Sequence, residues 1–94
     1  MVPIHPGRIL RRELKARQLS ANALARALRV PSGRIVDILN GKRSITAETA
    51  LRLGRYFGNA PQFWLNLQAA YDLRVALESA GSEIAKLPKR RSAN

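Results

Sequence analysis

Apolar residues recur along this chain at spacings of three and four, and no segment alternates with a period of two. The pattern therefore predicts an all-α protein. Four short amphipathic helices are expected over residues 8–17, 20–28, 32–40 and 47–57, each with one apolar face. A fifth helix is expected from residue 61 to about residue 79, because Pro61 suits a first helical turn.

Capping and helix-breaking residues separate the predicted helices. Ser20, Ser32 and Thr46 are expected to cap the second, third and fourth helices with their hydroxyl groups. Residues 29–31 are expected to be non-helical and to separate the second helix from the third, since the residue before a proline disfavours the helical conformation. Gly41 is expected to end the third helix in a left-handed conformation.

The predicted fifth helix is unusually apolar, with 11 apolar residues among the 15 of residues 63–77. Such a helix is covered from more than one direction, and we expect a second copy of the chain to cover its other side. A stripe on it is predicted to form core or dimer interface: Phe63, Trp64, Leu67 and Tyr71. We therefore expect one domain over residues 1–81, with a dimerisation helix at 61–79, and a basic, mostly disordered tail at 82–94.

Positive charge is concentrated in the first four predicted helices. The chain has 17 Lys and Arg against six Asp and Glu, a formal net charge of +11 at pH 7. Residues 1–58 carry +9, residues 59–85 carry −2 and residues 86–94 carry +4. This asymmetry favours a polyanionic partner. Nucleic acid is the first candidate, because contacts of Lys and Arg with phosphates release counterions and so favour binding. The alternative is that basicity only keeps the protein soluble.

The composition argues against several other classes. With no cysteine and a single histidine, His5, the sequence predicts no metal site, no catalytic triad, no cofactor and no enzyme. The longest uncharged stretch, residues 56–71, is too short and polar to cross a bilayer. The first residues lack the apolar run of a signal peptide, so we expect a cytoplasmic protein without a membrane partner. Aromatic residues at 5% offer few platforms for stacking single-stranded bases.

The second and third predicted helices have the spacing of a helix-turn-helix, in which the second helix enters the major groove of DNA. If Ile35, Ile38 and Leu39 face inward, the outer flank of that helix is free to meet base edges. The predicted base-reading residues are Ser32, Gly33, Arg34, Val36 and Asp37.

Each of these residues has a chemical reason to read DNA and an ordinary alternative. Arg34 can donate two hydrogen bonds to guanine, and Asp37 can accept a hydrogen bond from the amino group of cytosine. Val36 can make an apolar contact with the methyl group of thymine. The alternatives are a phosphate contact or solvated charge for Arg34, orientation of an arginine for Asp37, and surface packing for Val36. Gly33 allows close backbone approach, and Ser32 can bind a base or simply cap the helix.

Phosphate contacts are predicted for the loop that follows the third helix and for the start of the second helix. The loop combines a glycine turn with two adjacent cations, and a helix N-terminus attracts phosphate through its amides and dipole. The predicted phosphate-binding residues are Ser20, Asn40, Lys42 and Arg43. For Ser20 the alternative is a plain helix cap.

Residues 4–77 resemble the HigA/VapI-type antitoxins of the XRE, or phage-repressor-like, helix-turn-helix family. The resemblance includes His5-Pro6-Gly7, the run at residues 19–28 and Asn40-Gly41-Lys42-Arg43. Its most specific part is Phe63-Trp64-Leu65-Asn66-Leu67-Gln68, followed by Tyr71-Asp72-Leu73. It implies a five-helix repressor-like domain and a bacterial homodimer, joined by its C-terminal helices. It also implies a palindromic double-stranded operator, autorepression, and a RelE-like mRNA-cleaving toxin as protein partner.

Three residues depart from the family pattern. Arg29 stands where a left-handed glycine is usual, so the turn of the motif is expected to be strained or different. Arg8 replaces a usual acid, and Ala60 lacks the hydroxyl that normally caps the last helix, which leaves Asn59 or a backbone turn to serve.

Two other functions stay open on the sequence. The first alternative is a stand-alone helix-turn-helix repressor with no toxin. The second is a basic protein-interaction module that docks on an acidic partner or RNA.

Overall fold

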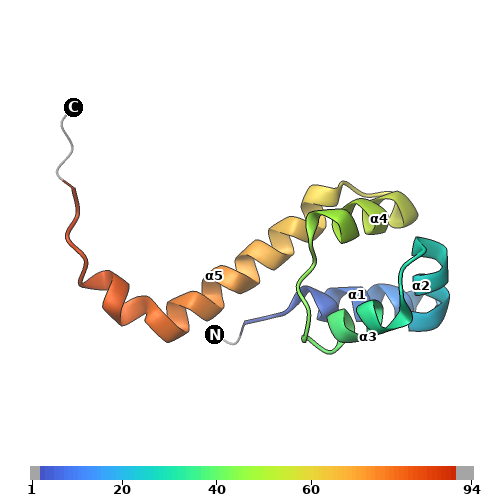
Figure 1. Cartoon of the computed structure of the whole chain (residues 1–94), viewed down its shortest axis with the longest axis horizontal. Helices are drawn as coiled ribbons and strands as arrows, with labels where there is room; N and C mark the ends of the chain where they lie inside the picture. Colours follow the sequence, from blue (N-terminus) through green and yellow to red (C-terminus); the bar gives the residue numbers. More distant parts are fainter. Residues whose placement is uncertain (1–2, 91–94) are drawn as a thin grey trace.

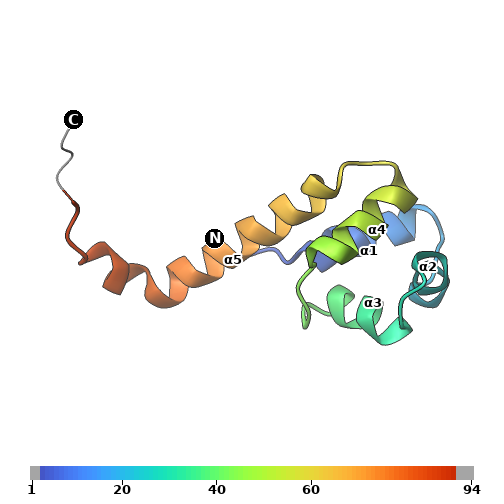
Figure 2. The ribbon, with the colours of Figure 1, turned by 45° about the horizontal axis from the view of Figure 1, so that its top comes forward.

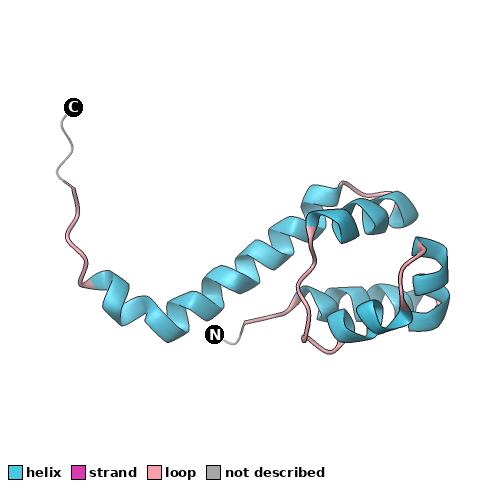
Figure 3. Ribbon diagram, viewed as in Figure 1, coloured by secondary structure: helices cyan, strands magenta, loops and turns pink. Residues whose placement is uncertain are grey.

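The computed structural model describes residues 3–90, and this part of the chain forms five α-helices joined by short loops (Figure 3). They are α1 (Pro6–Ala16), α2 (Ala21–Leu28), α3 (Ser32–Leu39), α4 (Ala47–Phe57) and α5 (Pro61–Ala85). The predicted all-α class and the predicted order of helices are confirmed.

Helices α1 to α4 form a head, and α5 begins against α4 and then runs away from the head (Figures 1 and 2). The long axis of the molecule is 52 Å, against 28 and 22 Å for the other two. The radius of gyration of 16.6 Å is well above the value of about 12 Å expected for a compact domain of this length. The excess comes from the projecting half of α5.

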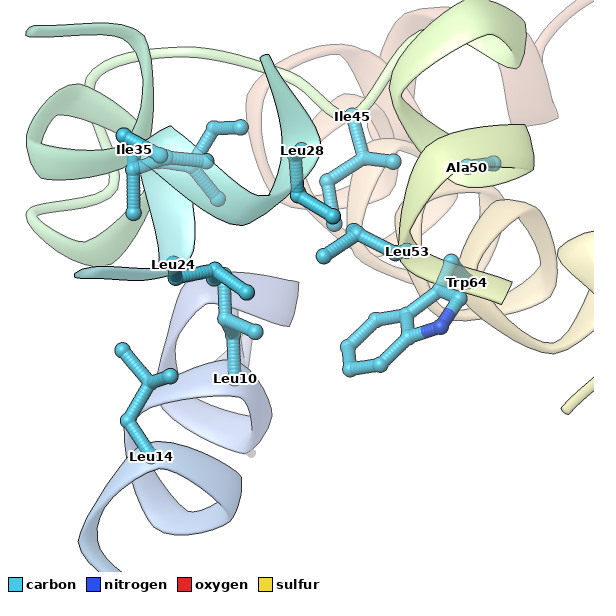
Figure 4. Packing of buried hydrophobic residues seen from close by; sticks show 11 residues of the cluster. Leu10, Leu14, Leu24, Leu28, Ile35, Ile45, Ala50, Leu53 and Trp64 are labelled. Carbon is cyan, nitrogen blue, oxygen red and sulfur yellow. The ribbon is translucent and has the colours of Figure 1, made fainter. Parts of the chain in front are cut away.

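The core of the head draws at least one side chain from every helix (Figure 4). Leu10, Leu24, Ile35, Leu53 and Trp64 are all fully buried, as the apolar faces predict. The Trp64 indole Nε1–H donates a hydrogen bond to Asn59 Oδ1 at 3.0 Å, so its polar atom is satisfied. The first turns of α5 are therefore part of the same core as the helix-turn-helix.

Two of the three predicted hydroxyl caps are confirmed. Ser20 Oγ accepts from Ala23 N–H at 3.0 Å, and Thr46 Oγ1 accepts from Thr49 N–H at 3.4 Å. The prediction that Ser32 caps α3 is wrong, since Pro31 occupies the N-cap position and no side chain caps this helix. Extended Pro31 already offers its carbonyl to Arg34 N–H at 3.1 Å, which makes Ser32 the first helical residue.

The turn between α2 and α3 keeps the left-handed conformation although its residue is arginine. Arg29 has φ 58° and ψ 46°, and the amide of Val30 closes the turn on the Ala25 carbonyl at 3.0 Å. The expectation of a different turn is therefore wrong, and Arg29 adopts the strained alternative at a cost of about 1–2 kcal/mol. Packing of α2 against α3 outweighs this local cost.

Helix α5 ends at Ala85, six residues beyond the predicted end, so residues 82–85 are helical and the prediction of disorder for them is wrong. One glycine weakens a helix by about 1 kcal/mol without breaking it, and the flanking residues favour helix up to the neighbourhood of Pro88. Residues 91–94 of the predicted tail lie outside the described residues. Ala60 is the N-cap residue of α5 and provides no side-chain cap, and its carbonyl accepts from Phe63 N–H at 3.0 Å.

Within residues 3–90, not even the 25-residue α5 is both long and apolar enough to span a membrane.

Candidate nucleic-acid interface

Helix α3 presents its predicted outer flank to solvent. Ile35 and Ile38 are fully buried against the head, while Ser32, Gly33 and Val36 are exposed. Val36 is an apolar side chain with 40% of its surface accessible and no core role. The orientation of the helix that the sequence predicts is therefore the observed one.

Arg34 is held by a carboxylate from another helix. Its Nη1–H donates to Glu48 Oε1 of α4 at 3.0 Å, and its side chain is less exposed than that of Glu48. Glu48 also accepts from Arg52, four residues along α4, at 3.3 Å. The Glu48–Arg52 pair is visible in the sequence as an i, i+4 pair. Its link to Arg34 joins residues 14 positions apart on different helices, so it depends on the tertiary structure.

Backbone hydrogen bonds hold the predicted phosphate-binding loop, residues 40–43, against the end of α3. Gly41, with φ 73°, donates its N–H to the Ile38 carbonyl at 3.0 Å, and Lys42 N–H donates to the Asp37 carbonyl at 2.8 Å. The side chains of Arg43 and Asp37 form an ion pair at 3.9 Å. Asp37 thus contacts a cation of the loop, which is the alternative role that the sequence left open.

Arg11 of α1 also contacts the end of α3, which sequence reasoning did not predict. Its Nη2 donates to the Leu39 carbonyl and to Asn40 Oδ1, both at 3.2 Å. The Asn40 amide nitrogen therefore faces away from this bond as a donor. No sequence signal marks Arg11, because its partners lie 28 and 29 residues away.

His5 lies under the same loop and caps α1. Its Nδ1 accepts from Gly7 N–H at 2.9 Å, and its ring meets Tyr71 of α5 edge-on with centroids 4.9 Å apart. A Cβ added to Gly41 would be only 3.8 Å from His5 Cγ. His5 thus contacts α1, α5 and the loop. A signal for the cap was present, since Pro6 at the first helical position makes His5 the N-cap residue.

The cap gives His5 a pH-dependent role in stability. Partial burial lowers the pKa of His5 below its ordinary value of 6.5, against opposing effects of a hydrogen bond to the Arg43 backbone and the charge of Asp72. Because the unfolded chain then binds the proton more readily, the free energy of unfolding is expected to fall as pH drops below about 6.5 and to level off below the folded-state pKa. Urea unfolding between pH 8 and pH 5 measures this.

The control for this prediction is His5→Asn. Asparagine is a good N-cap that accepts the same backbone hydrogen bond but does not titrate in this range. The variant is expected to keep its cap and lose the change between pH 7 and pH 5. An identical pH profile in both proteins would assign the effect to other groups.

The remaining predicted residues separate into core and surface. Ser20 lies at the exposed N-terminus of α2, and its cap bond leaves the hydroxyl hydrogen available as a donor. Trp64 belongs to the core, Leu67 and Tyr71 are half-buried, and Phe63 is 44% exposed. Among residues 3–90, no three His, Cys, Asp or Glu side chains are grouped to hold a metal ion.

Two helices joined by a tight left-handed turn, with the second exposed beside a basic loop, define a protein of the helix-turn-helix class. The helix-turn-helix family model matches residues 10–64, more than half of the chain. Virulence-associated protein I of Dichelobacter nodosus is 60% identical over 77 residues, which cover 81% of this chain and 71% of that relative. The chain belongs to the HigA/VapI-type antitoxins of the XRE-type helix-turn-helix family.

Solved structures agree with this assignment. An addiction module antidote protein of the HigA family from Coxiella burnetii has a TM-score of 0.92 and 53% identity, covering 97% of this chain and 100% of that one. The antitoxin HigA of Pseudomonas aeruginosa, solved with the higBA promoter, has a TM-score of 0.91 and 44% identity, covering 96% and 100%. The match extends along nearly the whole chain, so it includes α5 as well as the head.

Proposed function

We propose that this protein is a homodimeric autorepressor that binds a palindromic operator through α3 and also neutralises a RelE-like, mRNA-cleaving toxin. The observation that carries the DNA-binding part is the exposed flank of α3 beside the Lys42–Arg43 loop, with the helix braced from behind by α1 and α2. The structure of Pseudomonas aeruginosa HigA with its promoter supports the same use of this fold.

Base reading and phosphate binding fall to different residues. Arg34, Val36 and Asp37 carry the chemistry that distinguishes bases in the major groove, and Ser32 and Gly33 let the start of α3 approach closely. Lys42, Arg43, Asn40 and Ser20 bind phosphates and set the register of the protein on the duplex. Asp37 contributes by orienting Arg43 as well as by accepting from a base.

A second copy of the chain completes the reading surface. The projecting half of α5 exposes Leu73 at 72%, Leu77 at 58% and Ile84 at 55%, an apolar surface that a single chain leaves in water. Pairing through α5 presents two α3 helices, and a dimer reads two half-sites about 34 Å apart. This is the role proposed for the predicted dimerisation helix, now extended to Ala85.

The experiment is a salt titration of binding to the DNA upstream of the protein's own gene, with a scrambled duplex of equal length. If each dimer neutralises about six to ten phosphates, log K falls against log salt concentration with a slope of about −5 to −9. Two chains per operator are expected. A flat salt response, or equal affinity for both duplexes, contradicts the DNA-binding proposal.

Arg34→Ala is expected to weaken operator binding by about 1–3 kcal/mol and to relax preference at one base pair in each half-site. Lys42→Ala is the matched control. It is expected to weaken binding to the operator and to scrambled DNA alike and to reduce the salt slope by about two, one phosphate contact for each protomer. If Arg34→Ala behaves in the same way as Lys42→Ala, Arg34 is a phosphate contact.

Neutralisation of a toxin rests on family membership and is tested in cells. Co-expression with the product of the adjacent reading frame is expected to restore growth that this product alone arrests. Without rescue, the protein is a stand-alone repressor. The other alternative, a basic module for an acidic protein or RNA, predicts that neither the operator nor scrambled duplex DNA is preferred over single-stranded RNA.

A further inference from the structure

The carboxylate of Glu48 links α3, the proposed reading helix, to α4 and, through Arg52, to α2. Glu48 Oε1 accepts from Arg34 Nη1 at 3.0 Å, and its second oxygen accepts from Arg52 Nη2 at 3.3 Å. Arg52 in turn donates from Nη1 to the Leu28 carbonyl, the last residue of α2, at 2.8 Å. Arg34 is therefore tethered through Glu48 and Arg52 to the backbone at the end of α2.

A carboxylate at this position carries a cost for a DNA-binding protein. Glu48 is 60% exposed in its side chain and lies in the first turn of α4, which follows the basic loop. Hydrogen bonds from Arg52 and Arg34 lower the pKa of Glu48, so it is ionised at neutral pH. A negative charge near phosphates opposes the counterion-release gain that drives non-specific binding.

This cost is offset because Glu48 fixes the conformation of the Arg34 side chain, so that less conformational entropy is lost when Arg34 binds a base. An arginine side chain has about 2 kcal/mol of rotamer entropy to lose when it engages a base. Arg34 is 28% exposed, whereas Arg43, whose carboxylate partner is 3.9 Å away, is 52% exposed. One hydrogen bond to Glu48 occupies one of five guanidinium N–H donors, which leaves a fork for guanine.

We propose that Glu48 is a positioning residue that fixes Arg34 for base reading, so that it sets the specificity of DNA binding at the expense of general affinity. This inference rests on the proposed function, because it concerns how the same α3 surface discriminates bases.

The test is Glu48→Gln, which keeps the side-chain shape and removes the charge. Fluorescence anisotropy measures the Kd for the operator and for scrambled duplex at one salt concentration. The scrambled duplex is expected to bind equally or more tightly, since a negative charge is gone. The ratio of the two affinities is expected to fall about tenfold, within the range that one base contact supplies.

Two further variants separate positioning from charge. Glu13→Gln removes a carboxylate of α1 that pairs with Arg17, the residue directly after this helix. This pair does not involve α3, so the variant reports the effect of charge alone. Its affinity ratio is expected to stay at the wild-type value. In an Arg34→Ala background, Glu48→Gln is expected to leave the ratio unchanged, because the side chain that it positions is missing.

Three results would overturn the inference. An unchanged ratio in Glu48→Gln, with both affinities rising together, makes Glu48 an ordinary surface charge. An operator affinity that rises more than the affinity for scrambled DNA means that Glu48 restrains Arg34 from the bases. If the wild-type protein itself fails to discriminate the two duplexes, the proposed function fails, and that failure is visible before any variant is made.

Discussion

Trp64→Ala is expected to lower the free energy of unfolding by about 3–5 kcal/mol, the usual cost of truncating a buried aromatic side chain. Trp64 is fully buried where α5 meets the head, with the Phe57 ring centroid 5.9 Å from its own. The substitution leaves a cavity and removes the hydrogen bond that the Trp64 indole donates to Asn59 Oδ1. Because a small domain has only about 5–15 kcal/mol in total, this loss is a large fraction of the stability, and a clear fall in the melting temperature is expected.

Phe63→Ala is the control for this prediction. Phe63 is the adjacent aromatic residue of α5, but 44% of its surface is exposed. Its loss is expected to cost much less in the monomer, and any larger cost is expected to depend on protein concentration if Phe63 lies at the dimer interface. Thermal melting at two concentrations checks both variants. Equal and concentration-independent losses would contradict the placement of Trp64 in the core and Phe63 at the surface.

Gly7→Ala is expected to destabilise the protein by about 1–3 kcal/mol or more, because it forces α1 away from α3. A Cβ at Gly7 would lie 1.9 Å from the Ile38 carbonyl oxygen and 2.8 Å from the Ile38 carbonyl carbon. A carbon–oxygen contact needs about 3.3 Å, and a backbone atom has no rotamer with which to give way. Since Ile38 belongs to α3, operator affinity is expected to fall along with the melting temperature.

Gly33→Ala is the matched control, because it makes the same chemical change on α3 with the opposite expected sign. A Cβ at Gly33 meets no atom within 4 Å. In the free protein, alanine is expected to raise the free energy of unfolding by up to about 1 kcal/mol through its helix propensity, so the melting temperature stays the same or rises. If Gly7→Ala melts like Gly33→Ala, the close contact of α1 with α3 is not required for folding.

The helix-turn-helix and the inner faces of its helices follow from the sequence because they depend on local periodicity. Leu24, Ala25 and Leu28 are one, three and four positions apart, so they lie on one face of a helix. Ile35 and Ile38 are three positions apart and likewise lie on one face of α3. Each of these residues is buried as predicted. The exposed flank of α3 then follows, because a helix with one buried face must turn the other outward.

Errors arose where two local signals competed. Pro31 and Ser32 both suited the start of α3, and backbone geometry selected Pro31 as the N-cap. The sequence predicts that the fifth helix ends at about residue 79, close to Gly81, yet α5 passes through this glycine to Ala85 because nothing nearby stops the helix before Pro88. At Arg29, local preference opposed a left-handed turn, and the packing of neighbouring helices imposed it.

The sequence by itself determined the helical class, the helix-turn-helix, the basic surface and the family of this protein. Only the tertiary structure decided that Glu48 holds Arg34, that Arg11 contacts the end of α3, and that Trp64 is core while the far half of α5 is exposed. The physical reason is range. Periodicity and capping act within a few residues, whereas the contacts of Arg34 and Arg11 join residues 14 to 29 positions apart, and they exist only once the helices have packed.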